Sequence, residues 1–287
     1  MRTFSRLRRL LLLALCATAV PAGGASPAGT LRVMSFNVRV PVAQDGRHAW
    51  PHRRDLLVDT IASQSPDVVG TQELTRAQGD YLLARLPGYS WFGIDRRGGH
   101  DDEHMAIFYR RDRLRLVELG NFWLSETPNV PGSISWGHPF PRMVTWGLFE
   151  TIADGRRFYV YNTHFPYRAG DEPARTRAAA AIAARIAALP AAVPVVLTGD
   201  FNTEPGSPTY ALLSGSLADA RAQAGSVAGP EGTFHAFTGT PRRRIDWILA
   251  RGLRAARFHT DDRHRDGLYP SDHFPVTADF VPESPAP

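Results

Sequence analysis

The amino-acid sequence predicts an α/β fold in a single domain with a mixed β-sheet. Short apolar runs typical of buried strands recur along the chain, and two longer stretches between them have helical periodicity. Between residues 114 and 163 the strand-like runs follow one another without a helix, which requires antiparallel neighbours. Because helices separate other runs, we expect the sheet to be mixed.

Nine apolar runs predict strands, and two stretches predict helices. The helical stretch 53–63 places its apolar side chains on one face, and the Ala-rich stretch 173–189 does the same. Residues 218–232, rich in Gly and Ala, predict a loop, and residues 283–287 predict a frayed tail. The predicted strands lie at residues 31–38, 67–71, 105–109, 114–123, 143–151, 158–163, 193–198, 245–250 and 274–281.

Residues 1–25 predict a cleavable signal peptide, which leaves residues 26–287 as one catalytic domain. A basic start with four arginines precedes an apolar stretch over residues 10–20, and small residues follow. A membrane helix needs about 20 apolar residues, so this stretch is too short to span a bilayer. A lipid anchor on Cys16 is the alternative, but Leu15 is too large for a good lipoprotein cleavage site. We therefore expect a secreted or periplasmic protein.

The charge of the mature chain argues against a strongly basic nucleic-acid-binding surface. The full chain has 33 basic and 28 acidic residues, and the predicted signal carries four arginines and no acid. The remainder is close to neutral, although nucleic acid stays a possible substrate. Cys16 is the only cysteine and leaves with the signal, so no disulfide is expected in the mature protein.

Six short motifs place a polar group at the end of an apolar run or within one, at residues 35–37, 71–73, 162–164, 198–202, 245–247 and 269–275. Any one of them alone is best explained as a turn or a helix cap, but together they predict a metal-assisted site. Carboxylate and amide oxygens favour Mg²⁺ or Mn²⁺, whereas a zinc site needs closely spaced His and Cys residues. The donors are Asn37, Glu73, Asp200, Asn202, Asp246 and Asp272.

In this order and spacing, the motifs resemble the endonuclease/exonuclease/phosphatase superfamily over residues 31–280. Residues 199–202 and 271–273 are the most specific parts, and residues 122–128 and 141–146 resemble a bacterial, largely uncharacterised branch. The superfamily includes deoxyribonucleases, neutral sphingomyelinases, inositol phosphatases and nocturnin-like deadenylases. The resemblance implies a four-layer sandwich of two mixed β-sheets flanked by helices.

The same resemblance implies roles for individual residues. Asn37 and Glu73 match the metal-binding pair of the superfamily, with Asp272 as a further contributor. His273 matches the histidine near the scissile phosphate and is oriented by Asp246. The remaining catalytic positions are Asp200, which orients or deprotonates the attacking water, and Asn202 and His164, which donate to the phosphate.

Four further features have both a functional and a structural interpretation. Arg142 could grip a second phosphate or form a surface salt bridge, and Glu103 could lie near the metal or be a solvated loop acid. His235, between two aromatic residues, could bind substrate or simply pack. The run 242–244 could guide an anionic substrate or be a solvated charge cluster.

These observations predict a monomeric, divalent-metal-dependent hydrolase of phosphate esters, either a phosphodiesterase or a phosphatase. A nuclease or a sphingomyelinase-type phospholipase is the alternative within the superfamily. A membrane contact is expected only for a lipid substrate, and it needs an exposed apolar hairpin, for which residues 122–123 and 136–140 are candidates. A non-catalytic binding protein on the same fold is the alternative of another class, although that route normally removes a metal ligand or the terminal histidine.

Overall fold

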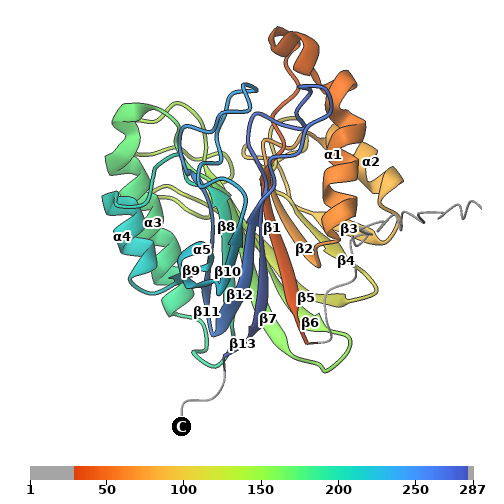
Figure 1. The fold of residues 1–287 in the computed structure, drawn as a ribbon. Coiled ribbons are helices and arrows are strands. Elements are labelled where there is room, and N and C mark those ends of the chain that lie inside the picture. Colours follow the sequence, from red (N-terminus) through yellow and green to blue (C-terminus); the bar gives the residue numbers. More distant parts are fainter. Residues whose placement is uncertain (1–28, 284–287) are drawn as a thin grey trace, which may run out of the picture.

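The computed structural model describes residues 29–283, and the predicted leader lies outside them. Two β-sheets stand face to face in the middle of the molecule, with helices on both outer sides (Figure 1). Pairings within each sheet are both parallel and antiparallel, because β1 runs parallel to β2 and β7 parallel to β8 while most other neighbours are antiparallel. The predicted sandwich of two mixed sheets in one domain is confirmed.

The first sheet has seven strands and the second has six. The first has the order β10-β12-β13-β1-β2-β4-β3, and the second has the order β5-β6-β7-β8-β11-β9. The strands of the first sheet are β1 (Leu31–Asn37), β2 (Val68–Gln72), β3 (Tyr89–Phe92), β4 (Ile107–Arg110), β10 (Ser226–Ala228), β12 (Leu253–Thr260) and β13 (Val276–Pro282). Those of the second are β5 (Leu114–Trp123), β6 (Met143–Thr151), β7 (Arg157–His164), β8 (Val195–Asp200), β9 (Ala218–Asp219) and β11 (Asp246–Arg251).

Helices cover the outer face of each sheet. In Figure 1, α1 (Trp50–Gln64) and α2 (Arg76–Arg85) lie beside the first sheet, and α3 (Glu172–Ala187) and α4 (Pro208–Ser214) lie beside the second. A short helix α5 (Ala220–Gln223) and two 3₁₀ turns, η1 (Ala43–His48) and η2 (Ala169–Asp171), complete the fold. No helix among residues 29–283 is long and apolar enough to cross a membrane.

All nine predicted strands and both predicted helices are present. The structure also contains elements that were not predicted: β3, β9, β10, β12, α2, α4 and α5. The stretch 218–232 is not simply a loop, because it contains β9, α5 and β10. These elements have two to four residues, too few to show a period. Strand β12 does alternate between buried and exposed residues, with arginines on its exposed positions. Helix α2 begins with a capping box between Thr75 and Gln78, a signal present in the sequence.

Three apolar layers hold the four structural layers together. One layer fills the space between the sheets and includes Val33, Phe149 and Ile248. The other two lie under the helices: Leu57 and Phe36 pack between the first sheet and α1, and further apolar residues pack between the second sheet and α3. Each sheet is thus covered on both faces, which explains why the central strands are continuous apolar runs.

The interface between the sheets becomes polar towards the ends of β2, β7 and β8. The Asn162 side chain donates from Nδ2 to the carbonyls of Thr71 (2.8 Å) and Ala106 (3.0 Å), and its Oδ1 accepts from Gln72 Nε2 (2.7 Å) and Thr198 Oγ1 (3.0 Å). Because this buried amide joins both sheets and all its bonds are satisfied, it fixes their relative position just below the strand ends.

Gly70 lets the sheets approach this closely, and we expect Gly70→Ala to destabilise the protein by about 1–3 kcal/mol. A Cβ atom on residue 70 would lie 2.6 Å from Asn162 Oδ1 and even closer to Thr198 Oγ1. Urea unfolding followed by circular dichroism measures the effect. Gly88→Ala is the matched control, because a Cβ there meets no atom within 4 Å. Equal stability of the two variants would contradict this account of the interface.

Candidate active site

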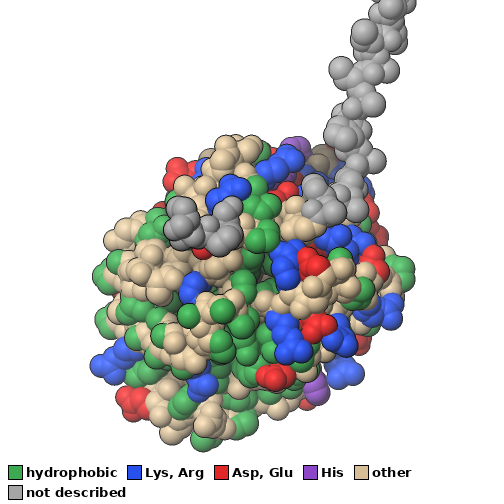
Figure 2. Space-filling view, turned by 90° about the horizontal axis from the view of Figure 1, so that it is seen from below, with side chains coloured by type: hydrophobic (Ala, Val, Ile, Leu, Met, Phe, Trp, Pro, Cys, Tyr) green, Lys and Arg blue, Asp and Glu red, His purple; other side chains and the backbone are tan. Residues whose placement is uncertain are grey.

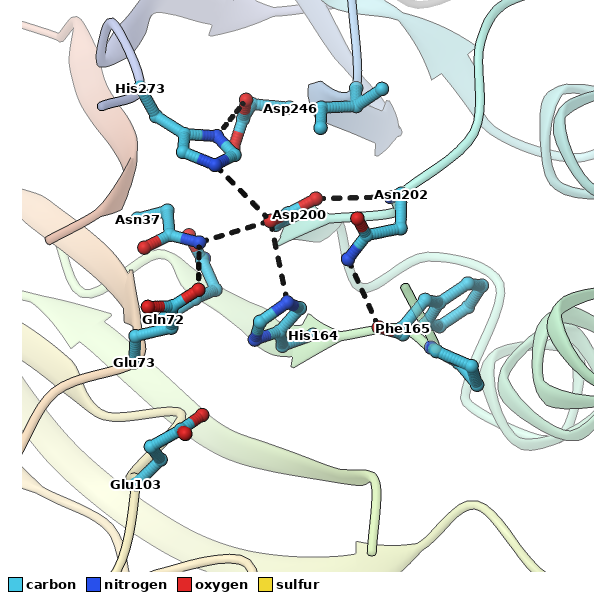
Figure 3. A network of polar contacts seen from close by, with 12 residues as sticks. Asn37, Gln72, Glu73, Glu103, His164, Phe165, Asp200, Asn202, Asp246 and His273 are labelled. Atoms are coloured by element: carbon cyan, nitrogen blue, oxygen red, sulfur yellow. Dashed lines mark hydrogen bonds and ion pairs between the residues drawn. The ribbon is translucent and has the colours of Figure 1, made fainter. Parts of the chain in front are cut away.

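The strand register gathers the predicted site residues at one end of the sandwich. His164 and Asp246, on strands either side of β8, are both paired with Asp200. In the other sheet Asn37 is paired with Gln72, which places Glu73 beside it. The loop before β13 brings Asp272 and His273 to the same end, since β13 is antiparallel to β1. Figure 3 shows six of these side chains converging from both sheets: Asn37, Glu73, His164, Asp200, Asp246 and His273.

A cavity of about 430 Å³ opens at this end of the molecule. Its walls are rich in ionisable groups, and most of them are buried. The residues that line it are Arg39, Val40, Glu73, Arg96, Glu103, Phe140, Arg142, His164, Tyr167, Asp200, Asn202, Phe234, Arg243, Ile245, Asp272 and His273.

A second cavity of about 320 Å³ lies at the opposite end. Figure 2 views the molecule from below and shows apolar side chains in the middle of that face, with charged groups beside them. The three acids of this cavity are paired with arginines: Asp67 with Arg113, Asp112 with Arg110, and Asp154 with Arg156. With its charges paired in this way, it lacks the converging ionisable groups of the first cavity, which is therefore the candidate active site.

His273 is held between two carboxylates. Its Nδ1 lies 2.9 Å from Asp246 Oδ2, and its Nε2 lies 3.8 Å from Asp200 Oδ2. Burial alone would lower the pKa of His273, but Asp246 and Asp200 outweigh it and raise that pKa to about 10. The imidazole is therefore a cation whose Nε2–H points towards Asp200 and the cavity, and Asp246 lies within hydrogen-bond distance of Nδ1, while its role in orienting the ring stays a prediction.

Asp200 occupies the centre of the site. Its Oδ2 accepts from Asn37 Nδ2 (3.0 Å), and its Oδ1 accepts from the backbone N–H of Asn202 (3.0 Å). Burial raises the pKa of Asp200 to about 7, and Asp246 adds to that effect, while His273 opposes it. A carboxylate with a pKa near neutrality is suited to accept a proton from water.

The residues described include a buried cluster of acids and a histidine that could bind a divalent metal. Asp200, Asp246 and His273 are close enough to share one ion. However, a histidine must be neutral to ligate a metal, whereas His273 is protonated and its Nδ1 is occupied by Asp246. The carboxylates of Glu73 and Asp272, which line the same cavity, are the better candidates.

The electrostatics of Glu73 and Asp272 fit a cation. Glu73 is half-buried, and hydrogen bonds from Val40 N (2.9 Å) and Asn37 Nδ2 (3.0 Å) overcome the effect of burial and lower its pKa, so it is ionised. Burial raises the pKa of Asp272, and the charge of Glu73 raises it further. A divalent ion between these oxygens would relieve that repulsion, as an all-oxygen Mg²⁺ site would.

Asn37 supports these carboxylates in the observed arrangement. Its Nδ2 donates to both Glu73 and Asp200, and its Oδ1 accepts from the backbone N–H of Arg39 (3.0 Å). The amide therefore bridges two acids through Nδ2, and its Oδ1 keeps one acceptor site free. Its predicted role as a metal ligand stays a prediction, while its position beside Glu73 is as expected.

His164, Asn202 and Arg142 form the side of the cavity suited to bind phosphate. Burial lowers the pKa of His164 well below its usual value, so the ring is neutral, and its Nε2 lies 3.4 Å from Asp200 Oδ2. Asn202 Nδ2 donates one bond to the Phe165 carbonyl (3.1 Å), which leaves its second N–H. Among the residues described, Arg142 Nη1 has no hydrogen-bond partner although it is buried.

The structure decides several of the open interpretations. Arg142 is not a surface salt-bridge residue, because it is buried in the cavity wall. Glu103 also lines the cavity and is paired with Arg96 rather than being solvated. His235 does not line the cavity: it stacks on Phe274 with ring centroids 4.0 Å apart, which supports the packing interpretation over substrate binding.

The arginine run 242–244 and the two candidate hairpin segments each contain both cavity-lining and structural residues or are assigned to one of these groups. In the run 242–244 only Arg243 lines the cavity, because Arg244 forms a buried ion pair with Asp219 (2.6 Å). Phe122 and Trp123 are core residues rather than an exposed hairpin, whereas Phe140 lines the cavity. Arg39, Arg96 and Tyr167 also line it, although nothing in their local sequence distinguishes them from ordinary loop residues.

Residues 34–273 match the endonuclease/exonuclease/phosphatase family, so the chain belongs to this family of phosphoric ester hydrolases, which are typically metal-dependent. A family member from Bacteroides vulgatus is 32% identical, covers 88% of this chain and 99% of its own, and has a TM-score of 0.84. The mannosyl-6-phosphatase Bt3783 of Bacteroides thetaiotaomicron is 31% identical over 88% of this chain and 99% of its own, with a TM-score of 0.81.

The curated relatives are more distant and longer. Human Nocturnin is 24% identical over 87% of this chain, which spans 65% of that relative. The chain spans 60% of an uncharacterised mimivirus protein and 42% of Drosophila Nocturnin. The solved human Nocturnin catalytic domain, 23% identical with a TM-score of 0.70, shows a shared fold.

Proposed function

We propose that the protein is an exported, Mg²⁺- or Mn²⁺-dependent phosphatase that hydrolyses small phosphate esters, with phosphorylated sugars as the favoured class. The observation that carries the proposal is the arrangement of His273, Asp200 and the Glu73 carboxylate around one cavity. A cavity of about 430 Å³ has the size of a small-molecule site. The similarity to a mannosyl-6-phosphatase over nearly its whole chain supports the substrate class.

Each residue has a chemical task in this proposal. Glu73 and Asp272 would hold the divalent ion, which supplies Lewis-acid stabilisation of charge on the phosphate when bound. Asp200 accepts a proton from the attacking water, His273 donates from Nε2 to the developing negative charge, and the remaining N–H groups on His164 and Arg142 bind non-bridging oxygens.

The alternatives have weaker support. A nuclease or a deadenylase acts on a polyanion, and the mature chain predicted from the sequence is nearly neutral. A sphingomyelinase-type enzyme needs an exposed apolar hairpin, and one of its two candidate segments is core. A non-catalytic binding protein would have no reason to keep a protonated histidine between two acids.

We also propose that the protein is a monomer and that its N-terminal leader directs its export.

Chelation should abolish the activity. In EDTA, release of phosphate from mannose 6-phosphate and 4-nitrophenyl phosphate should fall to background, and Mg²⁺ or Mn²⁺ should restore it, because the donor set is all oxygen. Bis(4-nitrophenyl) phosphate, RNA and sphingomyelin in the same panel test the alternatives. Full activity in chelator, or rescue by Zn²⁺ alone, would contradict the metal assignment. Faster cleavage of RNA or sphingomyelin would contradict the substrate class.

A further inference from the structure

One wall of the cavity carries side chains that have no task in the hydrolysis. Arg96 and Glu103 come from the segment between β3 and β4, Phe140 precedes β6, and Tyr167 follows β7. We call these four residues the Glu103 wall. In Figure 3, Glu103 lies on the side of the site away from His273, beyond Glu73. With the phosphate held by His273 and the metal site at Glu73, as proposed above, Glu103 would face the part of the substrate beyond the phosphate.

Arg96 makes this wall rigid. Its guanidinium is paired with Glu103 Oε2 (3.0 Å) and Asp102 Oδ1 (3.0 Å), and it lies 4.7 Å from the centre of the Phe140 ring. The residue is only 7% exposed. With two acids and an aromatic face fixed by one planar cation, the carboxylate of Glu103 is held in place before any ligand arrives.

Glu103 presents an unused acceptor to the cavity. Arg96 occupies Oε2, and no side chain or backbone N–H among residues 29–283 donates to Oε1. Burial raises the pKa of Glu103 to about 7, and the negative charge of Glu73 adds to that effect. A carboxylate placed there in spite of that penalty is suited to accept hydrogen bonds from ligand hydroxyl groups.

Tyr167 supplies a flat apolar face at the mouth of the cavity. It is 51% exposed, and its ring stacks on Phe140 with centroids 6.4 Å apart and an interplanar angle of 28°. Phe140 in turn lies against Arg96. The exposed face of Tyr167 is therefore backed by a fixed stack, as a platform for a ring-shaped ligand needs to be.

We infer that the Glu103 wall binds the hydroxylated ring of the leaving group, so that the substrate is a phosphomonoester of a sugar or similar polyol. Glu103 accepts from ring hydroxyls, Arg96 positions it, and Tyr167 packs on the ring. This inference rests on the proposed function. A nucleobase could also stack on Tyr167, but in a polynucleotide the Glu103 carboxylate would repel the neighbouring phosphate, which favours a polyol.

The test compares a substrate that has ring hydroxyls with one that lacks them. For Glu103→Gln, the kcat/KM ratio of mannose 6-phosphate to 4-nitrophenyl phosphate should fall by about tenfold to a hundredfold, since charged hydrogen bonds are lost. Tyr167→Ala should lower the same ratio about threefold to tenfold, mainly through KM. Glu126→Gln, a matched change on an exposed acid outside the cavity, should leave both rates unchanged.

Titration calorimetry on the EDTA-treated protein gives a second readout that does not need turnover. In this measurement, Glu103→Gln should weaken the binding of mannose 6-phosphate more than the binding of phenyl phosphate. Equal losses of affinity for both ligands would overturn the inference and leave the phosphatase proposal intact. If Tyr167→Ala loses more affinity for adenosine 5′-monophosphate than for mannose 6-phosphate, the wall is a nucleobase site instead. A wild-type protein that hydrolyses no ester in the presence of Mg²⁺ would contradict the proposed function, and calorimetry would still test the wall.

Discussion

Replacing His273 with alanine should lower kcat and kcat/KM together by about 10²–10⁴-fold. The imidazolium lies between Asp246 and Asp200, with its Nε2 facing the cavity, so its contribution is made as charge develops on the phosphate. Losing a transition-state interaction leaves substrate binding nearly unchanged. Steady-state kinetics with 4-nitrophenyl phosphate at saturating Mg²⁺ measures both parameters. A nearly normal His273→Ala enzyme would remove His273 from the mechanism.

The partnership with Asp246 can be tested separately. Asp246→Asn should have a related defect, because it removes the charge that raises the pKa of His273. The double variant should be little worse than the worse single variant, since the two residues act as one unit. Multiplicative losses would show that they act independently. His259→Ala, on β12 and outside the cavity, is the matched control and should keep normal kinetics.

Glu73→Gln should reduce turnover at low Mg²⁺ by about a hundredfold or more, through loss of metal affinity. The change preserves shape and removes the charge, but the single amide oxygen of glutamine can accept from only one of Val40 N and Asn37 Nδ2. High Mg²⁺ should restore part of the rate. Calorimetry with Mn²⁺ should show weaker binding, which is a readout independent of activity.

Two further measurements complete the test of Glu73. Urea unfolding should still give a cooperative transition, with a loss of stability of about 1–3 kcal/mol, because the substitution keeps one of the two hydrogen bonds of residue 73. Glu118→Gln, on the exposed face of β5, is the control and should change neither metal affinity nor rate. Normal turnover of Glu73→Gln at low Mg²⁺ would make residue 73 a structural rather than a metal-binding residue.

The sequence by itself determined the main elements of the fold. Apolar runs such as 193–198 and the helical pattern at 53–63 report burial, and burial is imposed by the local residue types on both faces of a covered strand. Residue chemistry and family resemblance also predicted the candidate site, because six motifs with polar groups at strand ends occur together and in a familiar order. Their gathering at one end follows from strand ends that share an edge of a sheet.

Only the tertiary structure decided which loop side chains face the cavity. Arg142, His235 and the run 242–244 each had two interpretations, and no local pattern distinguishes a buried wall residue from a surface one. Arg96 and Glu103 share one loop, but they meet Phe140 and Tyr167 because segments distant in the sequence pack together, so these contacts depend on register and loop packing. The pKa values of His273 and Asp200 arise in the same way, from burial and from charges that only the packed fold brings within reach.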